Sequence, residues 1–181
     1  MLLTLRGTPF LYMGEELGLE DAVVPDEAVV DPGGRDGCRA PLPWTREPGA
    51  GWGPTPWLPL PPDAAERSVE AQTGDPTSML EHYRRLLRLR RAEPALHEGA
   101  IEMLDAPAGV LRWRRTAPAG SGGHPVIEVA INFTYHEVPD AVSPGEVLGG
   151  TALPGASLPD PPRSTAGTTL GPDEARIVAP A

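Results

Sequence analysis

The stretch that decides the fold runs from Gly7 to Trp44 and reads GTPFLYMGEELGLEDAVVPDEAVVDPGGRDGCRAPLPW. It opens with a short apolar run at residues 9–12, which is too short for a helix and lies between Gly7 and Gly14. This pattern predicts a buried strand over about residues 8–13. Beyond it, residues 17–74 show no sustained period and are rich in Pro and Gly. A buried strand that leads into a long polar loop is typical of the active-site face of an α/β barrel.

Charge and cysteine content exclude several classes of protein. Lys and Arg together number 15 against 25 Asp and Glu, and the net charge of −10 argues against binding to nucleic acid or to an anionic membrane. Cys38 is the only cysteine and the four His have no metal-ligand spacing, so neither a disulfide nor a metal site is expected. No stretch reaches the roughly 18 apolar residues of a membrane span, and the first six residues lack the features of a signal peptide. We expect a soluble cytoplasmic protein that needs no cofactor.

Further along the chain, periodicity predicts one helix and several strands. Asp75 and Pro76 at the expected N-cap and first turn, with an apolar stripe from Met79 to Leu87, predict a helix at 75–92 that Pro94 ends. Apolar and polar residues alternate over 111–114 and 127–133, which predicts strands with one buried face. Shorter strand candidates lie at 147–148 and 175–178, and residues 150–168 are expected to be a loose connection.

Two segments, GTPFLYMGEELGL at 7–19 and GRDGCRAPLPW at 34–44, closely resemble the late barrel segments of α-glucosidases in family 13 of the glycoside hydrolases, the α-amylase superfamily. The resemblance continues through the helix at 75–92 and, more weakly, to the C-terminus. It implies that residues 1–98 form the last strand and helix of a TIM (β/α)8 barrel and that residues 99–181 form a small antiparallel β-sandwich domain. Only the last third of such an enzyme is implied, so we expect the chain to be a fragment.

The resemblance also indicates which residues bind substrate. Related α-glucosidases use the second arginine of this motif, here Arg39, in the pocket that holds the non-reducing-end glucose. A guanidinium suits this role because its planar fork of donors engages hydroxyl and carboxylate groups together. A structural salt bridge is the alternative role for Arg39. Trp44 is a candidate for stacking on a sugar, and its alternative role, which we favour for Trp52 and Trp57, is to anchor the loop.

Glu15 and Glu16 are the most obvious pair for acid–base chemistry, because retaining glycosidases place two carboxyl groups about 5–5.5 Å apart. If these residues continue the strand, their side chains point to opposite faces and cannot flank one glycosidic bond. The resemblance agrees, because the family's catalytic carboxylates lie on earlier strands that this sequence does not contain. We therefore predict no catalytic residue here, and we expect Glu15, Glu16, Arg35 and Asp36 to hold the rim of the pocket.

The sequence thus predicts the C-terminal fragment of a retaining α-glucosidase, which hydrolyses α-1,4 or α-1,6 bonds in maltose- or isomaltose-type oligosaccharides. Its partner in the complete enzyme is the α-glucoside substrate. Ala40 and Pro43 stand where many relatives have Thr and Gln, which leaves the linkage preference open. The alternative is a non-catalytic carbohydrate-associated or interaction module from a truncated gene. Because the catalytic carboxylates are missing, we expect the chain alone to be inactive.

Overall fold

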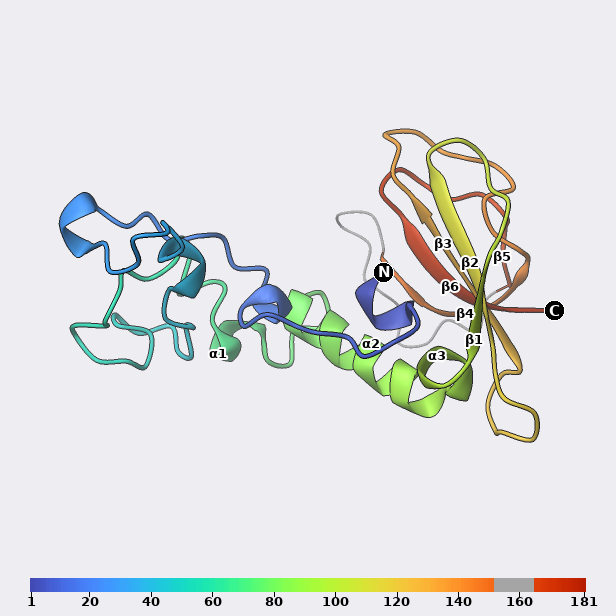
Figure 1. Cartoon of the computed structure of the whole chain (residues 1–181), viewed down its shortest axis with the longest axis horizontal. Helices are drawn as coiled ribbons and strands as arrows, with labels where there is room; N and C mark the ends of the chain where they lie inside the picture. Colours follow the sequence, from blue (N-terminus) through green and yellow to red (C-terminus); the bar gives the residue numbers. More distant parts are fainter. Residues whose placement is uncertain (152–164) are drawn as a thin grey trace. The chain divides into compact units, whose positions relative to one another are not determined.

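The computed structural model of the chain describes residues 1–151 and 165–181, which divide between two compact units (Figure 1). The sheet unit comprises Met1–Pro9 and Arg85–Ala181, and the loop unit comprises Phe10–Arg84. The domain boundary expected between residues 98 and 99 lies inside the sheet unit. The loose connection expected over 150–168 falls mostly outside the described residues.

Within the described residues, the sheet unit contains six antiparallel strands in the order β1-β2-β3-β6-β4-β5 (Figure 1). They are β1 (Ala100–Met103), β2 (Val110–Thr116), β3 (Val126–Asn132), β4 (Gly145–Gly150), β5 (Thr165–Ala166) and β6 (Ala175–Pro180). The two strands expected from alternation are confirmed as β2 and β3, and the two shorter candidates are confirmed as β4 and β6. The two unexpected strands, β1 and β5, are short and lie at the edges of the sheet, where pairing with one neighbour holds them.

Strand β3 is buried on both faces, so the expectation of a single buried face is wrong for this strand. On one face, Ile127 and Val129 pack in a core with Trp113 of β2, which is opposite Val129 in the strand register. The other face contributes to a second core, formed by Ala130, Val138, Ala141, Val142, Leu170 and Val178. When both faces of a central strand are covered, the residues that point to either face are buried. Alternation of apolar and polar residues in β3 therefore does not distinguish buried positions from exposed ones.

The described strands form one antiparallel sheet, so the expected antiparallel pairing is confirmed, whereas the expected sandwich is not confirmed. One face packs against Leu86 and Leu89 of α2 (Met79–Ala92) and against α3 (Pro94–His97). The other face packs against the segment at 138–142, which pairs with Leu170 through an isolated bridge at Val138. Helices and a loop thus bury the apolar faces that a second sheet would bury in a sandwich.

Helix α2 begins at Met79 instead of the expected Asp75, because Asp75 closes a turn of its own. Its carboxylate accepts hydrogen bonds from the backbone N–H and hydroxyl of Thr77, at 2.9 and 2.7 Å, and Ser78 Oγ then accepts from the N–H of Glu81. The helix ends at Ala92 as expected, since Glu93 is extended before Pro94. No helix in the described part of the chain is long and apolar enough to cross a membrane.

Two buried arginines fix the N-terminal segment, including the 3-10 turn η1 (Leu2–Thr4), to the sheet unit. Arg90 of α2 donates to the carbonyl oxygens of Leu3 and Leu96, both at 2.8 Å. Arg115 of β2 donates to the carbonyl oxygen of Thr4 at 2.6 Å. Burial lowers the pKa of both guanidiniums. Their cationic donors satisfy carbonyl groups that would otherwise be buried without a partner.

The loop unit has little regular structure and is held by a small core. It contains the 3-10 turns η2 (Glu15–Leu17), η3 (Asp26–Ala28) and η4 (Gly37–Arg39) and the short helix α1 (Val69–Gln72), which was not expected. Leu17, Leu42 and Leu80 form its buried apolar cluster. The buried amide of Gln72 links the parts of this cluster, because it donates to the carbonyl oxygen of Leu17 at 2.9 Å and accepts from the N–H of Leu80 at 3.0 Å.

The structure describes no strand over residues 8–13, where a buried strand was expected. No described residue pairs with this segment as a β-strand, and the Phe10 side chain is 83% exposed. A strand exists only through hydrogen bonds to a neighbouring strand, and an apolar run supplies the propensity without supplying that neighbour. The described residues accordingly contain no closed barrel, only one open antiparallel sheet and the loop unit.

Candidate functional site

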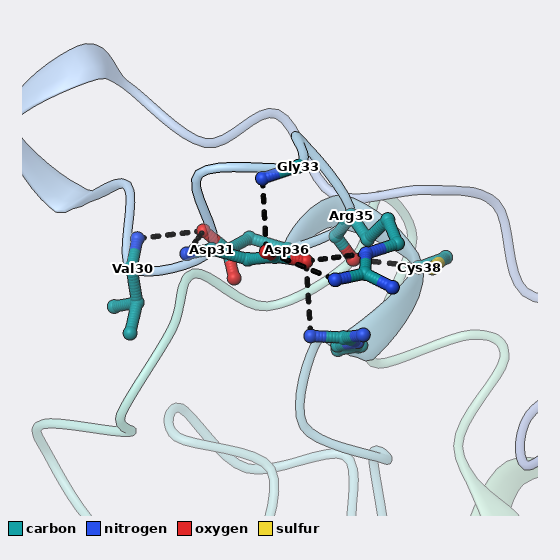
Figure 2. A network of polar contacts seen from close by, with 7 residues as sticks. Val30, Asp31, Gly33, Arg35, Asp36 and Cys38 are labelled. Atoms are coloured by element: carbon teal, nitrogen blue, oxygen red, sulfur yellow. Dashed lines mark hydrogen bonds and ion pairs between the residues drawn. The ribbon is translucent and has the colours of Figure 1, made fainter.

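The site is built on the segment at 30–39, in which the carboxylate of Asp36 fixes the backbone. Its Oδ2 accepts hydrogen bonds from the N–H groups of Val30 at 2.7 Å and Asp31 at 2.8 Å (Figure 2). Asp36 is only 4% exposed, and both bonds are partly buried. The next residue, Gly37, has no room for a side chain, because a Cβ there would come within 2.8 Å of the carbonyl oxygen of Ala22. The R-D-G-C-R motif therefore carries a close backbone contact as well as polar side chains.

Asp31 is the centre of the polar network that Figure 2 shows. Its Oδ2 accepts from Nε of Arg35 at 2.6 Å and pairs with an amino group of Arg39 at 3.0 Å. Its Oδ1 accepts from the second amino group of Arg35 at 3.2 Å and from the N–H of Gly33 at 2.9 Å. The hydrogen bond from Arg35 and the one from Gly33 lower the pKa of Asp31, with a smaller contribution from the charge of Arg39. The carboxylate is thus held ionised.

Arg39 lies at the end of η4 with its side chain 38% exposed. Within the described part of the chain, Asp31 is the only side chain with which it pairs. Its backbone N–H donates to the carbonyl oxygen of Asp36 at 3.0 Å. One amino group is therefore anchored, while the other donors of the guanidinium have no hydrogen-bond partner within the described part of the chain. This geometry is compatible with both the structural salt bridge and the substrate contact considered for Arg39, since an anchored arginine still offers donors to a ligand.

The three loop tryptophans differ in how they are held. Trp44 and Trp52 are about equally exposed, at 50% and 49%, and backbone bonds to Ala50 and Glu70 fix Trp44. Trp52 donates its indole N–H to the carbonyl oxygen of Leu42 at 2.7 Å. Trp57 is exposed. The hydrogen bond supports an anchoring role for Trp52, and the open face of Trp44 suits contact with an apolar ligand surface.

Glu15 and Glu16 lie on η2 instead of a strand, so the argument from alternating strand faces does not apply to them. Glu16 accepts from the N–H of Gly14 at 2.9 Å, and this bond closes the turn. Burial raises the pKa of the Tyr83 hydroxyl, and the charges of Glu15 and Glu16 raise it further. Glu15 also lines a cavity of about 190 Å³ together with Tyr12, Met13, Gly14, Leu19, Glu20, Asp21, Gly37, Cys38, Ala40 and Pro61.

The structure thus brings Arg35, Asp36 and Arg39 together around Asp31, a residue that sequence reasoning missed. Arg35 pairs with Asp31, and Asp36 accepts hydrogen bonds from backbone N–H groups. A signal was present: Asp31 is four residues before Arg35 and opens Asp-Pro-Gly-Gly, a turn sequence. Neither Arg39 nor Trp44 lines the cavity beside Glu15.

A second polar cluster lies within the sheet unit, and sequence reasoning missed it too. The side chain of Glu128 on β3 is fully buried and pairs with Arg112 of β2 at 2.6 Å. It also accepts from the N–H and hydroxyl of Ser143, at 2.8 and 2.9 Å. Burial acts to raise the pKa of Glu128, but the bonds from Arg112 and Ser143 outweigh it and lower the pKa. No group of His, Cys, Asp and Glu among the described residues is arranged to hold a metal ion.

Comparison with known proteins agrees with the motifs in the loop unit. Residues 1–99 match the model of the α-amylase catalytic domain, so the chain belongs to the α-amylase family of glycoside hydrolases. The resemblance expected from the two motifs is thereby confirmed. The chain is 42% identical over 126 residues to a probable α-glucosidase of Rhizobium meliloti, a match that covers 64% of this chain and 23% of that protein. It is 36% identical over 136 residues to the trehalose synthase/amylase TreS of Mycobacterium tuberculosis, covering 70% of this chain and 21% of the relative.

Solved structures of similar proteins match nearly the whole chain. The α-glucosyl transfer enzyme XgtA is 34% identical with a TM-score of 0.74, and the match covers 98% of this chain and 34% of that one. The trehalulose synthase MutB of Pseudomonas mesoacidophila is 26% identical with a TM-score of 0.76, over 98% of this chain and 36% of that one. The chain therefore spans about a third of these two structures, and less of the two relatives named above.

Proposed function

We propose that the chain is the carboxy-terminal part of a retaining α-glucosidase that hydrolyses α-1,4 or α-1,6 bonds in maltose- or isomaltose-type oligosaccharides. The observation that carries the proposal is the geometry of Arg39, which is anchored at one amino group by Asp31 and otherwise open. The relatives support it, since they include a probable α-glucosidase and oligo-1,6-glucosidases. In this role Arg39 donates to hydroxyl groups of the bound glucose, because a guanidinium offers several donors in one plane.

The other candidate residues take supporting roles. Trp44 offers its exposed indole face to the apolar face of a sugar ring. Arg35 and Asp36 hold the loop that carries Arg39, one through the Asp31 carboxylate and the other through backbone N–H groups. Glu15 and Glu16 shape η2 at the edge of the loop unit and are assigned no catalytic step. The proposal involves no metal or cofactor.

Retaining hydrolysis uses one carboxyl group as nucleophile and a second as acid and then base, about 5–5.5 Å apart. No residue of this chain is proposed for either role. We assign both carboxyl groups to a barrel segment that completes the site in the full enzyme, while this chain supplies the grip on the sugar. Binding energy from such contacts accelerates the reaction to the extent that it is stronger in the transition state.

A chimaera tests the proposal directly. In it, residues 1–181 replace the matching carboxy-terminal segment of the Rhizobium meliloti relative, to which this chain is 42% identical. Purified chimaera is incubated with maltose, isomaltose, sucrose, trehalose and an aryl α-glucoside, and the products are separated. Release of glucose that retains the α configuration supports the proposal. A folded chimaera that releases no glucose contradicts it and favours a non-catalytic carbohydrate-associated module.

The same assay tests a second candidate, transfer of an α-glucosyl group to a sugar acceptor. This candidate is favoured by the α-glucosyl transfer enzyme at 34% identity and by the trehalose synthase/amylase at 36%. A transferase forms the same covalent intermediate but passes it to a sugar hydroxyl instead of water. Disaccharide products that exceed free glucose at substrate concentrations near KM would identify transfer as the main reaction.

A further inference from the structure

The Asp31 carboxylate is engaged by contacts within its own loop. Its two oxygens accept three hydrogen bonds, two from Arg35 and one from the backbone N–H of Gly33, and Oδ2 also forms an ion pair with Arg39. An ionised carboxylate has about four acceptor positions, so these contacts leave little room for a substrate hydroxyl. Any effect of Asp31 on a bound sugar therefore passes through the groups that it holds.

The two arginines use Asp31 in different ways. Arg35 places Nε and an amino group on the two carboxylate oxygens, which is a two-point contact. Arg39 places a single amino group on Oδ2 at 3.0 Å. Arg35 therefore orients the carboxylate, and Arg39 is anchored at one corner with its remaining donors directed elsewhere. A guanidinium is rigid and planar, so fixing one corner restricts the direction of the others.

The backbone ties Asp31 and Arg39 to one residue. The buried Asp36 accepts the N–H of Asp31 with its carboxylate at 2.8 Å and the N–H of Arg39 with its carbonyl at 3.0 Å. The backbones of Asp31 and Arg39 are thus both held by hydrogen bonds to Asp36. Such an arrangement restricts where the free donors of Arg39 can lie, which is what recognition of a particular hydroxyl requires.

We propose that Asp31 is a positioning residue of the sugar-binding site, which holds one amino group of Arg39 so that its other donors face the hydroxyl groups of the bound glucose. The inference rests on the proposed function and goes beyond it, because it makes Arg39 and Asp31 one functional unit. Loss of Asp31 then harms substrate binding only where Arg39 is present. A carboxylate that merely stabilised the loop would act independently of Arg39.

The kinetic test is a double-mutant cycle in the chimaera, with Asp31→Asn, Arg39→Lys and the combined variant. Asp31→Asn keeps the shape of the side chain but removes its charge, so the anchor on Arg39 weakens. We expect kcat/KM for maltose to fall about ten- to a hundredfold, mostly through KM, as for the loss of a charge-assisted hydrogen bond. The combined variant should be within about twofold of the weaker single variant, because coupled residues are not additive.

Asp63→Asn is the matched control. Asp63 pairs with an arginine four residues later, Arg67, at 3.9 Å, as Asp31 does with Arg35, but it does not contact Arg39. We expect this control to leave kcat/KM within about twofold of the unsubstituted chimaera. Multiplicative effects of Asp31→Asn and Arg39→Lys on kcat/KM would overturn the inference, and so would equal losses in Asp31→Asn and Asp63→Asn.

A second measurement in the 181-residue chain tests the pairing without any activity. The titration of the Asp31 carboxyl group is followed by 13C NMR in the unsubstituted chain and in Arg39→Gln. If Arg39 holds Asp31, removal of its charge raises the pKa of this carboxyl group, and an unchanged titration midpoint overturns the inference. A folded chimaera without activity contradicts the proposed function instead, and a shifted midpoint then still demonstrates the Asp31–Arg39 pair.

Discussion

Replacing Arg39 by Lys should impair substrate binding far more than replacing Arg35 by Lys. Arg39 has one amino group on Asp31 at 3.0 Å and further donors open to a ligand, whereas both side-chain contacts of Arg35 go to Asp31. A lysine ammonium keeps the charge but loses the planar fork, so it does not hold the anchor and the sugar in the same geometry. The comparison therefore separates directional contact from net charge.

The magnitude follows from the donors that are lost. One or two charge-assisted hydrogen bonds to the sugar, each about 1.5–3 kcal/mol, correspond to a roughly ten- to ten-thousand-fold loss of kcat/KM for Arg39→Lys. Arg35 is 62% exposed and pairs with a carboxylate of its own loop, so its replacement should change kcat/KM by less than about fivefold. Both variants are made in the chimaera with the Rhizobium meliloti relative and assayed with maltose.

Melting temperature distinguishes the two roles considered for Arg39. If Arg39 binds substrate, the melting temperature of Arg39→Lys should stay within a few degrees of the unsubstituted chimaera, and if it is a structural clamp the temperature should fall clearly. Unchanged kinetics in Arg39→Lys together with a crippled Arg35→Lys would show that the wrong arginine has been assigned to the sugar. Loss of activity in both variants with a large loss of stability would refute the separation of roles.

Three further predictions concern the tryptophans, the buried glutamate and the chain itself. Trp44→Ala should raise KM for maltose about tenfold with little change in melting temperature. Trp52→Ala loses a hydrogen bond to Leu42 and should destabilise the fold by about 1–2 kcal/mol with KM nearly unchanged. The opposite pattern would reverse these roles. The folded state lowers the pKa of Glu128 from its ordinary 4.5, so this residue stabilises the fold above that pH and the contribution is lost as pH falls through the lower folded value. Glu128→Gln should cost about 3 kcal/mol at neutral pH and flatten the acid dependence measured by thermal melts, and an unaltered acid limb would contradict this. The purified 181-residue chain should hydrolyse none of the test glucosides, because two catalytic carboxyl groups are required; turnover abolished by Glu15→Gln or Glu16→Gln would disprove this.

Local patterns were sufficient for most of the sheet unit. The alternation around Trp113 and Ile127 located β2 and β3, because the period of a strand is a property of its own residues. Pro94 located the end of α2, since proline restricts the residue before it whatever the surroundings. Local patterns do not supply a paired neighbour, and at residues 8–13 the apolar run forms no strand among the described residues and Phe10 is exposed.

The candidate site was predictable in part. The motif identified Arg35, Asp36 and Arg39 as a group, and the fold does gather them within one short segment. The partner choice was not predictable, because Arg35 turns away from its sequence neighbour Asp36 to Asp31. Which carboxylate meets which guanidinium depends on the backbone path between them, and Asp36 determines that path by binding the N–H groups of residues 30 and 31.

Sequence alone determined the family, the antiparallel strands and the end of α2, because each is encoded in short runs of residues that act on their own backbone. Only the tertiary structure decided that Glu128 is buried against Arg112, that β3 is covered on both faces and that Asp31 unites two arginines. These features join side chains through strand register and turn geometry. Their energies depend on burial and on distances of about 3 Å, and neither quantity is defined until the chain has folded.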